Sequence, residues 1–214
     1  MALTIYGSPR SRTLRVLWAA EELGLTYQHV PLAFDDRALQ SPEFLRINPA
    51  GAIPAIVDDG FALTESLAIN LYLAKRYGRA RQAALYPASA EAEASAWRWT
   101  LWAQAHLEPW LQRDALLAGA LAALGEHPKA WIARQLAVLD GVLAARPWLL
   151  GERFTIADLN VAAVLSPSRS ERLDLEPTPH VSGWLRRCYA RPAPIAVRER
   201  LASFEDALRS RITR

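Results

Sequence analysis

Residues 48–69 constrain the fold of this chain more than any other stretch, because they define the order of several elements at once. Two short apolar runs, at residues 54–57 and 61–63, flank Asp58-Asp59-Gly60, a sequence typical of a tight hairpin turn. Thr64 then stands where a helix N-cap is expected. The segment is therefore predicted to form a loop, a strand, a turn, a second strand and the start of a helix.

The start of this helix suits an anionic ligand. The first backbone N–H groups of a helix have no partner inside it, and the helix dipole places partial positive charge there. We expect the amides of Glu65, Ser66 and Leu67 to face a carboxylate. Ile53-Pro54 precedes the first strand of the hairpin, and a cis bond at this position would turn the Ile53 backbone outward, toward an extended peptide.

The chain divides into two parts with different patterns. Before Gly78, strand and helix candidates alternate: strands at 3–6 and 26–32, helices at 14–24, 41–47 and 64–77, and the hairpin between the last two helices. The order β-α-β-α-β-β-α predicts a small α/β domain with a mixed sheet. After Gly78 the strand signals vanish, and segments rich in Ala, Leu, Arg, Glu and Trp predict an all-helical bundle.

We therefore expect an α/β domain at residues 1–78, a linker at 79–90 and an all-α domain at 91–214. The best local signal in the helical part is a capping box. Thr155 is suited to cap a helix, and Asp158, a shorter substitute for the usual Glu, is placed to reach back to it.

Composition and charge exclude several classes of protein. The 214 residues are 51% hydrophobic with a net charge of +3, which is ordinary for a globular protein and gives no basic stripe for nucleic acid. A single cysteine, Cys188, excludes an intrachain disulfide and a C-x-x-C pair and fits a reducing cytoplasm. The N-terminus has no signal-peptide pattern, and the longest apolar run, at 115–124, is too short to span a membrane. We expect a soluble cytoplasmic protein.

Five motifs in order resemble those of the cytosolic glutathione S-transferases, in their serine-type, bacterial-like form. The motifs are Leu-Thr-Ile-Tyr-Gly-Ser-Pro-Arg-Ser-Arg-Thr at 3–13, Asn48-Pro49 through Ile53-Pro54, Glu65-Ser66, Leu85-Tyr86-Pro87, and the box from Thr155 to Asp158. The resemblance covers nearly the whole chain. It implies a thioredoxin-like N-terminal domain, a helical C-terminal domain, glutathione as co-substrate without a further cofactor or metal, and a homodimer.

The resemblance also implies how glutathione is held. The Ile53 backbone, ahead of Pro54, would pair with the cysteinyl part, while Glu65 and Ser66 would hold the γ-glutamyl amine and carboxylate. The family's side chains for the glycyl carboxylate are missing. Gly51 and Ala52 stand where a basic or amide residue is usual, and Gln40 is the nearest substitute for a basic residue ahead of Pro-Glu-Phe. We expect weaker affinity for glutathione or a slightly different thiol.

Catalysis by glutathione requires a stabilised thiolate, because a free thiol with a pKa of about 8.5 is mostly protonated at neutral pH. Lowering that pKa by about two units needs roughly 2.7 kcal/mol, and one hydrogen bond to the charged sulfur supplies roughly 1.5–3 kcal/mol. Ser11 matches the serine of serine-type members and is the predicted donor, although the same hydroxyl also suits a helix N-cap. Ser8, Thr13 and Tyr6 remain alternatives.

Electrophile specificity in this family comes largely from the helical domain. Trp99, Trp102, His106 and Trp110 follow one another at helical spacing, a pattern more typical of a core or a subunit interface than of a pocket. Trp102 and His106 are the candidates for an electrophile pocket, and nothing near His106 has metal-ligand spacing. The predicted reaction is transfer of glutathione to a small hydrophobic electrophile. The alternatives are glutathione-dependent isomerisation, dehalogenation or peroxide reduction, and a catalytically silent binding module.

Overall fold

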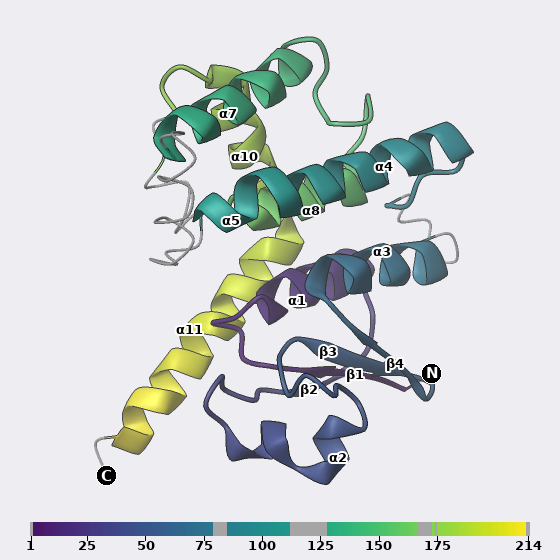
Figure 1. Ribbon diagram of the computed structural model, residues 1–214, viewed down its shortest axis with the longest axis vertical. Coiled ribbons are helices and arrows are strands. Elements are labelled where there is room, and N and C mark those ends of the chain that lie inside the picture. The colour runs from purple at the N-terminus through teal and green to yellow at the C-terminus, as the bar shows by residue number, and fades with distance from the viewer. Residues whose placement is uncertain (1, 79–84, 112–127, 167–172, 174, 213–214) are drawn as a thin grey trace. The chain divides into compact units, whose positions relative to one another are not determined.

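The computed structural model describes residues 2–78, 85–111, 128–166, 173 and 175–212 (Figure 1). The chain forms two compact units, one of residues 1–86 with 190–214 and the other of residues 87–189. The domain division expected from the sequence, 1–78 and 91–214 with a linker at 79–90, stays a prediction. Half of the predicted linker, residues 79–84, and the apolar run at 115–124 lie outside the described residues.

The first unit is built on a four-stranded mixed sheet with the strand order β2-β1-β3-β4. Its strands are β1 (Leu3–Tyr6), β2 (Gln28–Val30), β3 (Ala55–Asp58) and β4 (Phe61–Thr64). β1 pairs with β2 in parallel and with β3 in the antiparallel sense, and β3 pairs antiparallel with β4. The predicted α/β order and mixed sheet are confirmed. β2 is shorter than predicted because Pro31 has no N–H to continue the ladder.

Helices cover both faces of this sheet. They are α1 (Thr13–Glu22), the 3₁₀ turn η1 (Arg37–Gln40), α2 (Pro42–Leu45) and α3 (Ser66–Tyr77). Figure 1 shows α1 and α3 on one face and α2 on the other. Along β1 the side chains alternate between these faces: Ile5 is fully buried, and the ring of Tyr6 meets Phe44 of α2 edge-on, with 5.8 Å between ring centroids.

The last helix, α11 (Pro192–Ile212), packs on α1 within the first unit (Figure 1). Its Val197 is buried, and Arg200 Nη2 of α11 pairs with Glu21 Oε1 of α1 at 2.6 Å. Arg191, the residue before α11, pairs through Nε with Glu22 Oε1 at 2.7 Å. Apolar burial and complementary charge therefore hold this C-terminal helix against α1 of the α/β elements.

The predicted cap of α3 is wrong. Asp59 and Gly60 form a two-residue turn with φ of 48° and 88°, the positive values of a primed hairpin turn, and the ladder continues to a pair between Ala55 and Thr64. Thr64 is thus the last residue of β4. Glu65 is the N-cap, with φ 66°, ψ 108° and no capping bond from its side chain. The amides without a partner inside the helix consequently begin at Ser66 rather than at Glu65.

The second unit is helical, as predicted. Its described elements are α4 (Ala90–Trp102), the π-helical turn η2 (Ala103–Leu107), α5 (Glu108–Leu111), α7 (Pro128–Ala144), α8 (Ile156–Val164) and α10 (Pro179–Tyr189). α8 is buried along its whole length, and all of its residues except Asp158 and Asn160 are apolar. No helix in the described parts of either unit is both long and apolar enough to cross a membrane.

The predicted capping box at the start of α8 is confirmed. The Asp158 carboxylate accepts hydrogen bonds from the Thr155 amide at 2.9 Å and hydroxyl at 3.0 Å, from the Leu149 amide at 2.8 Å and from the Trp184 indole N–H at 2.9 Å. Burial raises the pKa of Asp158, while these donors favour its charged form. One carboxylate thus fixes a helix start, a preceding turn and a residue of α10.

His29 holds the first turn of the chain against the edge of the sheet. Its Nε2 lies 2.9 Å from the carbonyl oxygen of Gly7, so this nitrogen carries the proton and donates it. Burial lowers the pKa of His29 from its ordinary value of 6.5; the bond to Gly7 opposes this shift, and the charge of Arg200 adds to it. The folded protein therefore favours the neutral imidazole.

We expect this depressed pKa to make the protein less stable in mild acid. Below about pH 6.5 the unfolded chain binds a proton at His29 that the folded chain does not, so the free energy of unfolding falls as the pH drops through the folded pKa. In His29→Gln, whose amide N–H can still reach Gly7, urea unfolding between pH 5 and 7 should show a weaker pH dependence than in the parent. If the free energy of unfolding depends on pH equally in both proteins, the pKa of His29 is not lowered in the folded state.

Candidate functional site

One line of paired residues across the sheet brings the predicted site segments together. Tyr6 of β1 lies opposite Ala55 of β3, and Ala55 lies opposite Thr64 of β4. Three segments therefore leave the sheet at the same edge, where β1 and β4 end and β3 begins. They are the turn after Tyr6, the Ile53-Pro54 pair before Ala55 and the helix start after Thr64. The register of three short strands places the predicted glutathione-binding residues and Ser11 in one region.

Close packing around Gly7 joins two of these segments. Gly7 has a φ of 127°, and a Cβ at this position would collide with Thr13 Oγ1 and lie 2.9 Å from Ile53 Cβ. A glycine is required here both for the backbone conformation and for the space. The N-terminus of α1 and the residue before Pro54 thus approach each other across this glycine.

The loop before Pro54 leaves a backbone edge available. The Ile53-Pro54 bond is cis, and Pro54 is buried. Asn48 braces the loop from within: its Nδ2 donates to the Ala52 carbonyl at 2.7 Å, and its Oδ1 accepts from the Ala50 amide at 3.1 Å. The N–H and C=O of Ile53 have no hydrogen-bond partner in the part of the chain that the structure describes, so both are open to an extended peptide.

The start of α3 combines a strained backbone with buried positive charge. Glu65 is exposed and has a positive φ, a conformation that non-glycine residues rarely adopt and that clusters at binding sites. Ser66 is 4% exposed, and its Oγ accepts a hydrogen bond at 3.4 Å from Nη1 of Arg15, which is 3% exposed. A carboxylate bound at this helix start would meet the helix dipole and the charge of Arg15 together.

Arg15 was not among the residues chosen from the sequence. Its position on α1 indicates a buried side chain, because it lies one turn before Trp18 and Ala19, both of which are fully buried. A charge on the buried face of a helix is rare unless it is paired, and such a residue is a candidate for a binding site.

The hydroxyl groups that compete to activate a thiol lie in different surroundings. Ser8 and Thr13 are buried, whereas Ser11 and Tyr6 are half-buried. The ring of Tyr6 packs on the α2 side of the sheet with the cluster of Leu39, Phe44 and Ala55. Among the three hydroxyls of the turn, Ser11 is therefore the most accessible.

Ser11 bridges the turn that leads into α1. Its Oγ accepts from the Thr13 amide at 3.0 Å, donates to the Ser8 carbonyl at 2.7 Å and lies 2.7 Å from Thr13 Oγ1. The N-cap of α1 is Arg12 rather than Ser11. Because the Ser11 hydroxyl can rotate about its C–O bond, the proton now directed at Ser8 can instead be donated to a ligand.

Gln40 lies against Gly51, in the loop before Pro54. Gly51 has a φ of 58°, and a Cβ there would meet Gln40 Nε2 at 2.5 Å and the Leu39 carbonyl oxygen at 3.1 Å. The Gln40 amide therefore occupies the space into which a side chain at position 51 would extend. Gln40 is exposed, so this amide is also accessible to a ligand.

The helical unit places Trp102 and His106 in an aromatic cluster. Trp102 donates to Gln135 Oε1 at 3.0 Å and meets Trp99 edge-on at 5.0 Å. His106 belongs to the π turn, its carbonyl accepts from Trp131 Nε1 at 3.0 Å, and its ring lies 5.6 Å from Trp131. The π turn directly precedes Pro109, where a regular helix would clash with the proline ring. A role for Trp102 and His106 in an electrophile pocket stays a prediction.

No group of three or more His, Cys, Asp and Glu side chains is arranged to hold a metal ion among the residues described. Cys188, on α10, is buried and forms no disulfide.

Comparison with known proteins gives consistent matches along the chain. Residues 1–75 match the model of the family described as glutathione S-transferase, N-terminal domain, and residues 123–192 match glutathione S-transferase, C-terminal domain. The chain is 36% identical to glutathione S-transferase 3 of Zea mays, over 89% of this chain and 90% of that protein. It is 31% identical to the disulfide-bond oxidoreductase YfcG of Escherichia coli, over 89% and 92%.

Solved structures give the same picture. The theta class glutathione S-transferase of Xanthomonas axonopodis pv. citri, solved with glutathione bound, superimposes with a TM-score of 0.72 at 28% identity. The match covers 89% of this chain and 94% of that one.

The packing of Gln40 against Gly51 predicts a specific pattern of stability. Gly51→Ala should lower the free energy of unfolding by about 1–2 kcal/mol, because alanine disfavours a positive φ and its Cβ displaces the Gln40 amide. Gly60→Ala is the control for the positive φ alone, since its φ is 88° and nothing lies within 4 Å of an added Cβ. In a Gln40→Ala background the penalty of Gly51→Ala should become smaller. Equal penalties in both backgrounds, measured by urea unfolding, would contradict this packing.

Proposed function

This chain belongs to the glutathione S-transferase family, and we propose that it stabilises the thiolate of glutathione for attack on small hydrophobic electrophiles. The proposal is supported by the register of Tyr6, Ala55 and Thr64. This register brings the turn that contains Ser11, the Ile53 backbone and the start of α3 to one edge of the sheet. The charges at this edge complement those of the γ-glutamyl end of glutathione.

In the proposed complex, the cysteinyl part pairs with the N–H and C=O of Ile53. The γ-glutamyl carboxylate binds at the start of α3, near Ser66 and Arg15, and the ammonium group faces Glu65. The Gln40 amide is the proposed contact for the glycyl carboxylate. A neutral amide donor contributes less to binding a carboxylate than a cationic side chain would, which supports the expectation of weaker affinity for glutathione.

Ser11 is the proposed thiolate donor. It lies in the turn that contacts Ile53 through Gly7 and Thr13, so the cysteinyl sulfur of a peptide paired with Ile53 would lie near this turn. The N-terminus of α1 adds favourable potential for the anion. Donation to sulfur requires the Ser11 hydroxyl to leave the Ser8 carbonyl, a rotation without backbone movement.

Substitution separates Ser11 from the alternative donors. Ser11→Ala should lower kcat/KM for conjugation by about 10- to 150-fold, the equivalent of one hydrogen bond to a charged sulfur, with little change in the Kd of glutathione. The kcat/KM of Tyr6→Phe should stay within about twofold of the parent value, because Tyr6 packs against Phe44 and is not the proposed donor. The reverse result, measured by steady-state kinetics and calorimetry, would assign the role to Tyr6.

Sulfur chemistry is a second candidate function, favoured by the 31% identity to YfcG, which is named a disulfide-bond oxidoreductase. The same thiolate would attack a disulfide sulfur instead of a carbon. Isomerisation, dehalogenation and peroxide reduction would also use it, whereas a silent binding module would bind glutathione with its thiol protonated. A panel of carbon electrophiles, peroxides and disulfides assayed with glutathione distinguishes these reactions.

We also propose a cytoplasmic homodimer with a role in detoxification. Large exposed apolar side chains support self-association: Phe61 on β4 of the first unit, and Trp97 and Leu101 on α4 of the second. Light scattering should give twice the chain mass of 23.8 kDa. The mass of a single chain at micromolar concentration would contradict the dimer.

A further inference from the structure

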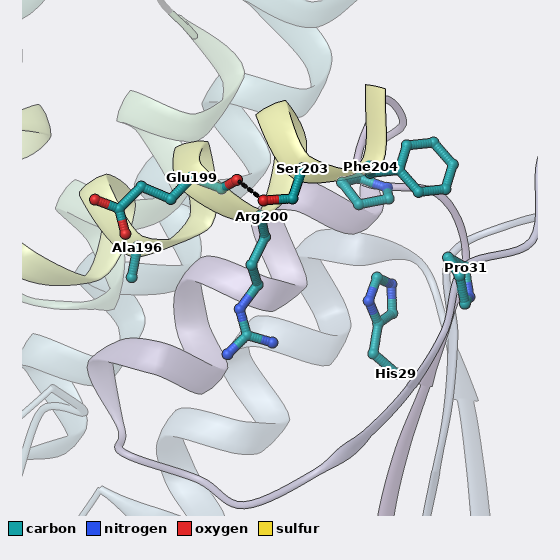
Figure 2. A pocket seen from close by; sticks show the side chains of 8 residues that line it. His29, Pro31, Ala196, Glu199, Arg200, Ser203 and Phe204 are labelled. Atoms are coloured by element: carbon teal, nitrogen blue, oxygen red, sulfur yellow. Dashed lines mark hydrogen bonds between the residues drawn. The ribbon is translucent and has the colours of Figure 1, made fainter. Parts of the chain in front are cut away.

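A pocket of about 490 Å³ lies in the first unit between α11 and the outer strand of the sheet, β2. None of its lining residues is proposed to hold glutathione. Its lining comes from the turn after β1, from β2 and its following loop, and from α11: Pro9, His29, Pro31, Ala196, Glu199, Arg200, Ser203 and Phe204. Figure 2 shows the ring of His29 directed toward α11 and the side chain of Arg200 extending from that helix on the other side of the pocket. The volume is within the range of small-molecule sites.

His29 offers this pocket a hydrogen-bond acceptor. Because its Nε2–H donates to the Gly7 carbonyl, the neutral ring keeps a lone pair on Nδ1. Nδ1 has no hydrogen-bond partner among the residues that the structure describes. Burial favours the neutral form, as its lowered pKa indicates, and Arg200 opposes a second positive charge beside it. A ligand at this point must therefore bring a donor.

Arg200 offers a donor without making the pocket cationic. Its Nη2 is paired with Glu21 Oε1 at 2.6 Å, and its guanidinium lies 5.2 Å from the centroid of the Tyr27 ring. Glu199 adds a negative charge to the lining, and its side chain points away from His29 in Figure 2. The guanidinium has further N–H groups beyond the one bound to Glu21. The balance of charge favours a neutral ligand over an anion.

The remaining lining is apolar and flat. Pro9, Pro31, Ala196 and Phe204 present ring and methyl surface, and the Ser203 hydroxyl already donates to the Glu199 carbonyl at 3.0 Å (Figure 2). Aromatic rings pack well on proline and phenylalanine surface. The pocket thus combines an aromatic-sized apolar volume with one acceptor and one donor.

We propose that this pocket binds a small neutral phenol, whose ring lies among Pro9, Pro31 and Phe204, whose O–H donates to His29 Nδ1 and whose oxygen accepts from Arg200. A hydroxyl satisfies both partners, since it donates and accepts through one atom. The inference does not depend on the chemistry proposed for glutathione, because none of these side chains was assigned to the thiol or to the tripeptide.

Calorimetry at pH 7.5 with the full chain tests the proposal with two matched probes, 2-naphthol and 2-methoxynaphthalene. The naphthol should bind at least about tenfold more tightly, because the methyl ether cannot donate to His29 and leaves its acceptor unsatisfied. Equal binding of both probes, or no binding of the naphthol, would overturn the proposal.

Two substitutions on exposed positions of α11 locate the site. Ser203→Trp places an indole in the pocket and should abolish naphthol binding, whereas Ala202→Trp, on the adjacent exposed residue outside the lining, should leave it unchanged. Circular dichroism verifies that both variants fold. Naphthol binding that survives Ser203→Trp would place the ligand elsewhere, and glutathione conjugation measured on the same samples reports separately on the proposed enzyme activity.

Discussion

The antiparallel pairing of β1 with β3 is the constraint on which the rest of the site depends. It sets Tyr6 opposite Ala55, and the hairpin then sets Thr64 opposite Ala55 from the other side. The turn after β1 and the two ends of the hairpin therefore leave the sheet at this line. A register shift of one residue would turn every side chain of β3 to the other face, so burial of Ile56 helps to fix the site geometry.

Electrostatics at this edge follow from the helices that begin there. α1 and α3 both start beside the line, so their amides and dipoles add positive potential where a tripeptide would place a thiolate and a carboxylate. The buried Arg15 strengthens this potential at Ser66. At the end proposed for the glycyl carboxylate, the absence of a side chain at Gly51 leaves room for the Gln40 amide.

The sequence predicted the order of strands and helices, because hydrophobic periodicity and turn residues are local signals. It also predicted the Thr155–Asp158 box, whose two partners lie within one turn. It failed at Thr64, since cross-strand pairing with Ala55 outweighed the residue's preference for a cap. Arg15 was missed because its pairing with Ser66 joins residues distant in sequence, and the packing of α11 on α1 is equally non-local, so no local signal indicates it.

The most direct measurement is ultraviolet difference spectroscopy of bound glutathione across a pH series, which records the thiolate itself. We expect binding to lower the thiol pKa by about two units from its free value of about 8.5, so that thiolate absorbance is present near pH 7. If glutathione binds at the site while its thiol titrates at the free value, the edge of the sheet holds the tripeptide without activating it, and the proposed thiolate stabilisation is wrong.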